Sequence, residues 1–311
     1  MNLIDFFKAL PDEESCKAKF REIREKEGII CRKCGCKEYY WKKDKESFEC
    51  KKCGVRTSLK SGTVMHKSKL SFQYWFIAIH LLTSTKKTFS AKEIQRQLNH
   101  KRYHPIWHMV HKIREAMGKR DGNYTLCGEL ELDDAFFTTH IPKEEKDKPL
   151  KRGRGSQRKS KVLVMAESMA VENPKPGKKS RKVGYIKMKV IDDLKSTTID
   201  GAVEENVSPK SNISSDDSTS YVGLSAKVEN HISKVILNKE IEKELPWVHI
   251  AISNAKRWML NNFHSMKPEY LQRYLDEFCY NFNRRYMRQK LFDRLLVACA
   301  ANKNTFRYTY G

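Results

Sequence analysis

The apolar positions along the chain change their spacing near Gly128, from the helical period of about 3.6 residues to the strand period of about 2. Acidic residues between Pro11 and Glu14 open a predicted helix that ends at Gly28. The run from Tyr74 to Leu82 is apolar nearly all round and predicts a second, buried helix. The first part of the chain is therefore expected to be helical, and the part after Gly128 to contain a sheet.

Two more helices are predicted before the spacing changes. Ser90 is placed to cap a short helix, and Pro105 opens a longer one whose apolar residues recur at helical intervals. With the short turn at Asn99 to His104 between them, the helices have the arrangement of a helix-turn-helix. An ordinary helical bundle has the same pattern, but the basic residues that flank the third helix favour DNA binding.

Three consecutive strands are predicted next. In the first, leucines alternate with acids from Glu129 to Phe137, and the other two cover 161–166 and 183–191. A further short strand ends at the acids of Asp216 and Asp217, and an apolar stripe from Leu271 to Phe282 marks a long helix. Strands mixed with helices predict an α/β fold.

Charge narrows the choice of partners. The 311 residues carry 61 Lys and Arg against 38 Asp and Glu, a net charge of +23. Such a field attracts polyanions, so nucleic acid or an anionic membrane surface is the expected partner. No stretch reaches the roughly 18 to 20 apolar residues needed to span a bilayer, and Met1 to Leu10 lacks the core of a secretory signal. The sequence thus predicts a cytoplasmic protein of about two domains.

Four of the nine cysteines form two Cys-x-x-Cys pairs, Cys31 with Cys34 and Cys50 with Cys53, separated by 15 residues. This is the spacing of a zinc ribbon, and four thiolates fill the tetrahedral sphere of a structural Zn²⁺. Cys36 could substitute as a ligand, although Cys34 fits the motif better. The others are interpreted as small core residues: Cys16, Cys127, Cys279 and Cys299.

Two pairs of adjacent acids stand at strand positions, Asp133 with Asp134 and Asp216 with Asp217. Alternation puts Asp133 on the polar face of its strand and Asp134 on the leucine face, so Asp133 is the better candidate for a metal ligand. Carboxylates from neighbouring strands can hold the divalent ions that activate a hydroxyl nucleophile in phosphodiester transfer. Acid pairs at strand ends are also common turn residues, and the residues alone leave both interpretations open.

Short motifs follow the cysteine pairs in a fixed order. They are Arg56-Thr57-Ser58, Trp75 to Ile79, Ile106 to Met109, Gly128 to Asp133, Arg152 to Gly155, and Tyr270 to Phe278. In this combination the chain resembles bacterial insertion-sequence transposases of the fifteen-ninety-five family, from about Phe6 to Leu295. The resemblance implies an RNase H-like domain, a mixed sheet with flanking helices, that acts with Mg²⁺ through a catalytic triad.

The resemblance also implies the members of this triad. Asp133 matches the first by its place in the Glu-Leu-Asp run, and Asp216 matches the second because Tyr221 follows five residues later. Many relatives carry Glu at the third place, and one branch carries Asn in a Ser-Asn-x-Lys run, which Asn254 fits. An amide oxygen suits Mg²⁺ better than an imidazole does, so Asn254 is preferred to His249. The alternative role for Asn254 is that of a helix N-cap.

Basic residues in two places are expected to contact DNA. Arg102, Lys112 and Arg114 belong to the third predicted helix and its approach, where they would reach phosphates or bases. The segment 151–161 is rich in basic residues and would attract DNA regardless of sequence, or else be a solvated insert. Its candidate contacts are Arg152, Arg154, Arg158 and Lys159.

The sequence therefore predicts a DNA transposase in four segments: a helical segment 1–28, a zinc ribbon 29–60, a helix-turn-helix region 61–122 and an RNase H-like catalytic domain 123–311. It would bind the terminal inverted repeats of its element as a homodimer or higher oligomer, cleave each end and join the 3′ hydroxyl to target DNA. The alternative is a non-catalytic, zinc-dependent DNA-binding regulator derived from such an enzyme.

Overall fold

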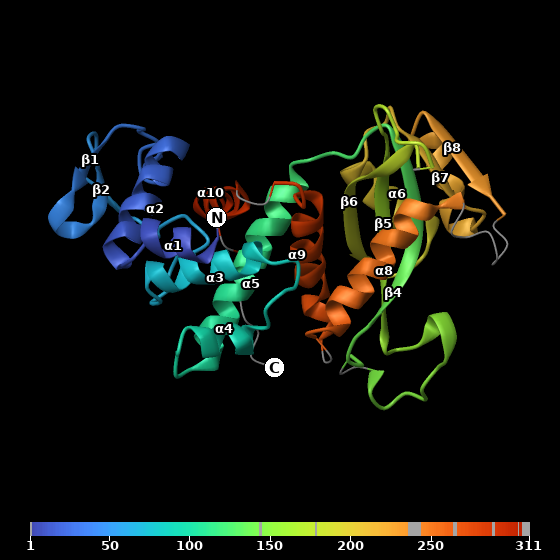
Figure 1. The fold of residues 1–311 in the computed structure, drawn as a ribbon, viewed down its shortest axis with the longest axis horizontal. Helices are drawn as coiled ribbons and strands as arrows, with labels where there is room; N and C mark the ends of the chain where they lie inside the picture. Colours follow the sequence, from blue (N-terminus) through green and yellow to red (C-terminus); the bar gives the residue numbers. More distant parts are fainter. Residues whose placement is uncertain are drawn as a thin grey trace. The chain divides into compact units, whose positions relative to one another are not determined.

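The computed structural model describes residues 2–142, 145–177, 179–235, 244–263, 266–287, 290–303 and 305–306, with only the backbone of Arg154. The chain forms two compact units (Figure 1). The first combines Met1–Arg120 with Arg284–Gly311, and the second is Asp121–Asn283. We expected the catalytic domain to run from 123 to 311, whereas the structure groups the residues after Asn283 with the first unit.

The first unit is built from helices and one small antiparallel sheet. The sheet has the order β1 (Tyr39–Lys42), β2 (Ser47–Cys50), β3 (Arg56–Ser58), with the 3-10 turn η1 (Lys43–Lys45) between the first two strands. The helices are α1 (Leu3–Ala9), α2 (Glu13–Glu27), α3 (Phe72–Ser84), α4 (Ala91–Gln97), α5 (Tyr103–Gly122) and α10 (Leu291–Ala301). The helices α2 to α5 were predicted; α1 and α10 were not.

Local sequence explains where these helices begin and end. The side chain of Asp12 caps α2 by accepting a hydrogen bond from the Ser15 N–H at 2.8 Å, and Gly28 ends the helix with a φ of 84°. Ser90 caps α4 in the same way, through the Glu93 N–H at 3.1 Å. Both caps are of the kind that the sequence predicts.

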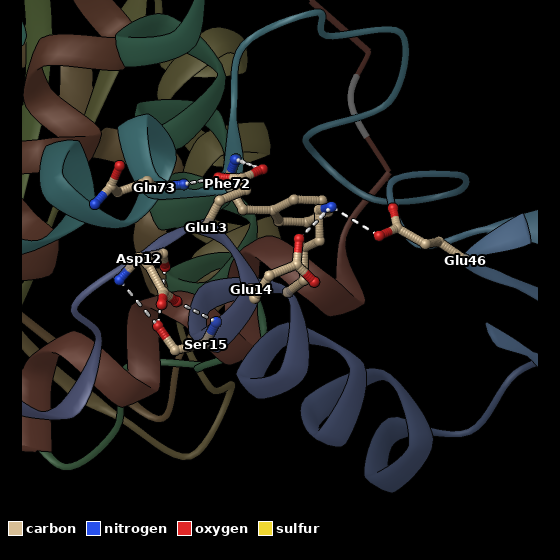
Figure 2. A network of polar contacts seen from close by, with 8 residues as sticks. Asp12, Glu13, Glu14, Ser15, Glu46, Phe72 and Gln73 are labelled. Atoms are coloured by element: carbon tan, nitrogen blue, oxygen red, sulfur yellow. Dashed lines mark hydrogen bonds and ion pairs between the residues drawn. The ribbon is translucent and has the colours of Figure 1, made fainter. Parts of the chain in front are cut away.

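Helix α2 connects the cysteine-bearing sheet to α3 (Figure 2). The carboxylate of Glu13 accepts hydrogen bonds from the backbone N–H groups of Phe72, at 2.9 Å, and Gln73, at 2.8 Å. The ammonium of Lys17 bonds to Glu46 of the hairpin at 2.7 Å. A carboxylate at a helix N-terminus satisfies N–H groups that have no partner within the helix. Glu13 therefore acts as a cap that comes from another element.

The second unit contains a five-stranded mixed sheet in the order β6 (Arg181–Ile191), β5 (Lys159–Ala170), β4 (Glu129–Thr138), β7 (Asn212–Asp216), β8 (Asn230–Lys234). The pairs β6–β5 and β5–β4 are antiparallel, and β4–β7 and β7–β8 are parallel. One face packs against α6 (Ser196–Asn206), and the other against α8 (Pro246–Leu260) and α9 (Leu271–Asn283) (Figure 1). The short 3-10 segments are η3 (Gly153–Gly155), η4 (Thr219–Ala226) and η5 (Pro268–Tyr270). This architecture fits an RNase H-like domain.

Amide side chains of α9 bond to the outer edge of β6. Gln272 accepts from the Val190 N–H at 2.9 Å and donates to the Met188 carbonyl at 3.0 Å. Asn283 accepts from the Ile186 N–H at 2.8 Å and donates to the carbonyl of the same residue at 3.0 Å. The edge strand thus has partners on both sides.

Helix α8 corrects one expectation. It begins at Pro246, so Asn254 lies inside the helix. An N-cap residue stands before the first helical residue, and the interpretation of Asn254 as a cap is therefore wrong. Across the described residues, none of the helices combines the length and the apolar character that a bilayer crossing requires.

Candidate catalytic and metal sites

The two candidate aspartates stand on adjacent parallel strands. Glu131 of β4 is paired with Ser214 of β7, and Asp133 and Asp216 follow two residues further along each strand. Neighbouring strands lie about 4.8 Å apart, and residues at matching positions of parallel strands point to the same face. The side chain of Asp133 is 16% exposed. The topology therefore places the two aspartates at matching positions of adjacent strands, although they stand more than 80 residues apart in the chain.

The face that carries these acids is the one covered by α8. Ala135 and Phe137, two and four residues after Asp133 on the same face of β4, belong to the core under α8 and α9. Leu130 and Leu132 belong to the core on the other side, under α6. This is the alternation that the sequence predicts, with Asp133 away from the leucine face.

His249 of α8 lies beside Asp133. Its Nδ1 is 3.6 Å from Oδ2 of the aspartate, and its side chain is 26% exposed. Lys256 follows seven residues later, on the same face of the helix and exposed. One edge of α8 thus presents an imidazole and an ammonium on the side of β4.

Asn254 points in another direction. At about 3.6 residues per turn, the step of five positions from His249 to Asn254 places them about 140° apart around α8. Asn254 shares its side of the helix with Trp247 and Trp258. The ring of Trp258 lies 5.8 Å from that of Phe278 in α9, and α9 covers β6 at the far end of the sheet from β7. The helix therefore does not present both candidates to Asp133.

The start of α8 is fixed by a carboxylate from β4. Oε2 of Glu131 accepts hydrogen bonds from the backbone N–H groups of Trp247, at 2.7 Å, and Val248, at 2.9 Å. Glu131 is buried, and burial raises the pKa of its carboxyl group, against the lowering effect of the two backbone hydrogen bonds. No sequence pattern indicates this contact, because the partners are 116 and 117 residues apart.

The four predicted zinc ligands converge in the first unit. The sulfur atoms of Cys31, Cys34, Cys50 and Cys53 all lie within 4.8 Å of one another, and three of the pairs are 3.5 Å apart. Four thiolates around one zinc ion stand about 3.8 Å apart, so this donor set fits a closed tetrahedral site. Cys36 bonds to the backbone of Glu38 and does not belong to the cluster.

A groove of about 820 Å³ lies beside the turn between α4 and α5. Among the described residues that line it there is no carboxylate. The half-buried Lys112 donates a hydrogen bond to the His66 carbonyl at 3.1 Å, and loss of solvent lowers the pKa of its ammonium group. The charged lining consists of five cations: Lys67, Lys69, Lys101, Arg102 and Lys112. The first three were not singled out from the sequence, where lysines beside a turn are too common to indicate a site.

The third basic residue predicted in this region is placed differently. Arg114 is only 1% exposed. A side chain buried to this extent does not present its guanidinium group to DNA, so the expected contact from Arg114 does not fit the structure. The helical spacing of the sequence shows that Arg114 lies off the apolar stripe of α5. It does not show that other elements cover that side of the helix.

A comparison with protein families identifies the second unit. The family model of the ISXO2-like transposase domain, which represents the IS1595 transposases, matches residues 125–283, just over half of the chain. The chain belongs to this transposase family. The matched range coincides with the unit Asp121–Asn283, which carries the sheet, Asp133, Asp216 and α8. No curated protein matches the chain.

Membership in the transposase family implies DNA as the partner and a DNA-processing role for the second unit. The basic segment 151–161, which leads into β5, belongs to this unit. Arg152, Arg158 and Lys159 are exposed there, and Lys159 donates a hydrogen bond to the Gly153 carbonyl at 3.2 Å. The side chain of Arg154 lies outside the described residues.

Proposed function

We propose that the protein is an active DNA transposase, which binds the terminal inverted repeats of an insertion sequence, cleaves the strands at its ends and joins the 3′ hydroxyl to target DNA. The observation that carries this proposal is the placement of Asp133 and Asp216 on adjacent strands, under α8, within a transposase domain. The enzyme would act in the bacterial cytoplasm on chromosomal DNA.

The two aspartates are the proposed ligands of Mg²⁺. Hard carboxylate oxygens are the ligands that this ion prefers, and a pair of them on one face of a sheet fits it. When bound, the ion would make the attacking hydroxyl a better nucleophile and stabilise the leaving oxygen. The chain's own contribution is to hold the carboxylates of Asp133 and Asp216 side by side.

We place His249, rather than Asn254, at the third catalytic position. Its imidazole lies on the side of α8 that faces Asp133, whereas Asn254 lies about 140° away around the helix. Lys256, on the same edge of α8, would contact a DNA phosphate near the reacting strand. This placement of His249 supports the choice by geometry over the choice by the preference of Mg²⁺ for an amide oxygen.

The first unit is proposed to recognise DNA. Zinc bound to the four cysteines would stabilise the ribbon, a segment with little core of its own. The cations of the groove beside the α4–α5 turn would bind phosphates of the element's end, and the helix-turn-helix arrangement would place α5 against DNA. The exposed residues Arg152, Arg158 and Lys159 would add sequence-independent attraction, and two or more copies would hold the paired ends.

Strand transfer in solution tests the proposal. A duplex with the element's terminal sequence and a free 3′ hydroxyl is incubated with the full-length protein, target DNA and Mg²⁺. We expect joined products that disappear in Asp133→Asn and Asp216→Asn while end binding persists. End binding without any cleavage or joining by the unaltered protein would instead indicate a DNA-binding regulator.

A further inference from the structure

Helix α8 has no cap of its own. Leu245 stands at the N-cap position, and its side chain makes no capping hydrogen bond. The first helical residue, Pro246, has no N–H to satisfy. The next two N–H groups, those of Trp247 and Val248, are the ones that an N-cap side chain normally binds. Both donate to Oε2 of Glu131, at 2.7 and 2.9 Å, so the cap of α8 comes from strand β4.

This contact joins the two elements that carry the proposed catalytic residues. Glu131 lies two residues before Asp133 on the same face of β4. Val248 and Trp247 directly precede His249 on α8. The carboxylate therefore ties the strand segment of Asp133 to the helical turn of His249, at the point where Nδ1 of the imidazole lies 3.6 Å from the aspartate.

We propose that Glu131 is a positioning residue for the reaction: by capping α8 from β4, it sets the place of His249 relative to Asp133. This inference rests on the proposed function of these two residues. Glu131 acts through the first turn of α8 and touches neither DNA nor metal in this role.

The chain contains a comparable contact that serves as a control, at a helix that also has its own cap from Ser71. Glu13 caps α3 from α2 in the first unit, with its carboxylate bonded to the N–H groups of Phe72 and Gln73 at 2.9 and 2.8 Å. Glu13→Ala therefore removes the same kind of contact from a helix that carries no proposed catalytic residue. If the loss of such a contact lowers the rate of strand transfer only through stability, both variants will be slower. If Glu131 positions His249, only Glu131→Ala will be slower.

The experiment compares Glu131→Ala, Glu131→Gln and Glu13→Ala in the full-length protein. The single-turnover rate of strand transfer is measured with protein in excess, at saturating end DNA and well below the unfolding temperature of each variant. We expect Glu131→Ala to lose at least tenfold in rate with unchanged end affinity. Glu131→Gln keeps a side-chain oxygen of the same reach and should stay within a few fold of the unaltered protein, as should Glu13→Ala.

A second readout does not depend on activity. The ring resonances of His249, followed by NMR in histidine-labelled protein without metal, are expected to shift in Glu131→Ala and to stay in place in Glu131→Gln and Glu13→Ala. If Glu131→Ala does not fold, Glu131→Asp replaces it, because this side chain keeps the charge but is too short to hold both N–H groups.

Two results would overturn the inference: a rate within twofold of the unaltered protein in folded Glu131→Ala, or His249 resonances that do not move in it. A complete lack of strand transfer by the unaltered protein would contradict the proposed function instead, and the NMR comparison would still decide whether Glu131 positions His249.

Discussion

Replacement of Asn254 by alanine is expected to leave strand transfer nearly unchanged, whereas replacement of His249 by alanine is expected to remove most of it. The two residues are close in sequence, but only His249 lies beside Asp133, with 3.6 Å between Nδ1 and Oδ2. Asn254 lies inside α8, on the side of Trp247 and Trp258. The two substitutions therefore distinguish between Asn254, which ligand chemistry favours, and His249, which the geometry favours, as the third catalytic residue.

The expected magnitudes follow from these positions. In the interior of a helix, alanine is favoured over asparagine by up to about 0.7 kcal/mol, so Asn254→Ala should leave the free energy of unfolding unchanged or slightly raised. A side chain that holds or moves a proton at the reacting centre typically contributes about 10²- to 10⁴-fold to the rate. At about 1.4 kcal/mol for each factor of ten, His249→Ala should raise the barrier by about 3 to 5 kcal/mol.

The assay is single-turnover joining of a pre-cut end duplex to target DNA in Mg²⁺, with end binding measured on the same preparations. His249→Glu provides a restoring variant, because a carboxylate at this position would offer a hard oxygen ligand that suits Mg²⁺, and it should keep measurable activity. Asp133→Asn should be inactive throughout. Loss of joining in Asn254→Ala, together with normal joining in His249→Ala, would refute the assignment and return the third position to Asn254.

Three further predictions concern other parts of the chain. Removal of zinc by a chelator, or Cys31→Ser with Cys50→Ser, should unfold the ribbon, and metal analysis of the purified protein should give one zinc ion per chain. Arg102→Ala should weaken end binding and reduce the slope of log affinity against log salt by about one, since it removes one phosphate contact, whereas Arg114→Ala should lower thermal stability with the slope unchanged. Burial raises the pKa of Asp276 to about 7, above its ordinary value near 3.8, so the folded state favours the protonated form. Its contribution to stability is present below about pH 4 and is lost as the pH rises through 7, and Asp276→Asn should flatten this decline in thermal melts between pH 4 and 7.

Local signals in the sequence were sufficient for much of the fold. Asp12 and Gly28 bracket α2 because capping and a positive φ depend on residues within one turn of the helix end. The alternation of leucines and acids placed Asp133 on the correct face of β4, because successive side chains of a strand point to opposite faces of the sheet. The cluster of four cysteines could be predicted because each Cys-x-x-Cys pair lies within one short turn, which places its two sulfur atoms close together.

The sequence failed where a structure depends on distant partners. The start of α8 has no capping residue at Leu245, because Glu131 of another strand supplies the cap. Without this start, the rotation of the helix could not be assigned from the sequence, and the preference for Asn254 over His249 rested on the Ser-Asn-x-Lys run and on ligand chemistry. The burial of Arg114 likewise depends on elements that its own helix does not reveal. In each case the contact that determines the structure joins residues far apart in the chain, and a pattern of neighbouring residues does not contain it.

The amide groups of Gln272 and Asn283 imitate a sixth strand along β6. Each offers one donor and one acceptor, as a peptide unit does, and together they occupy the N–H groups of Ile186 and Val190 and the carbonyls of Ile186 and Met188. An edge whose groups are already bonded is a poor template for strands of other molecules, which protects the protein from aggregation by edge-to-edge pairing. It also restricts assembly: a second copy of the chain could pair with this part of the sheet edge only after displacing α9.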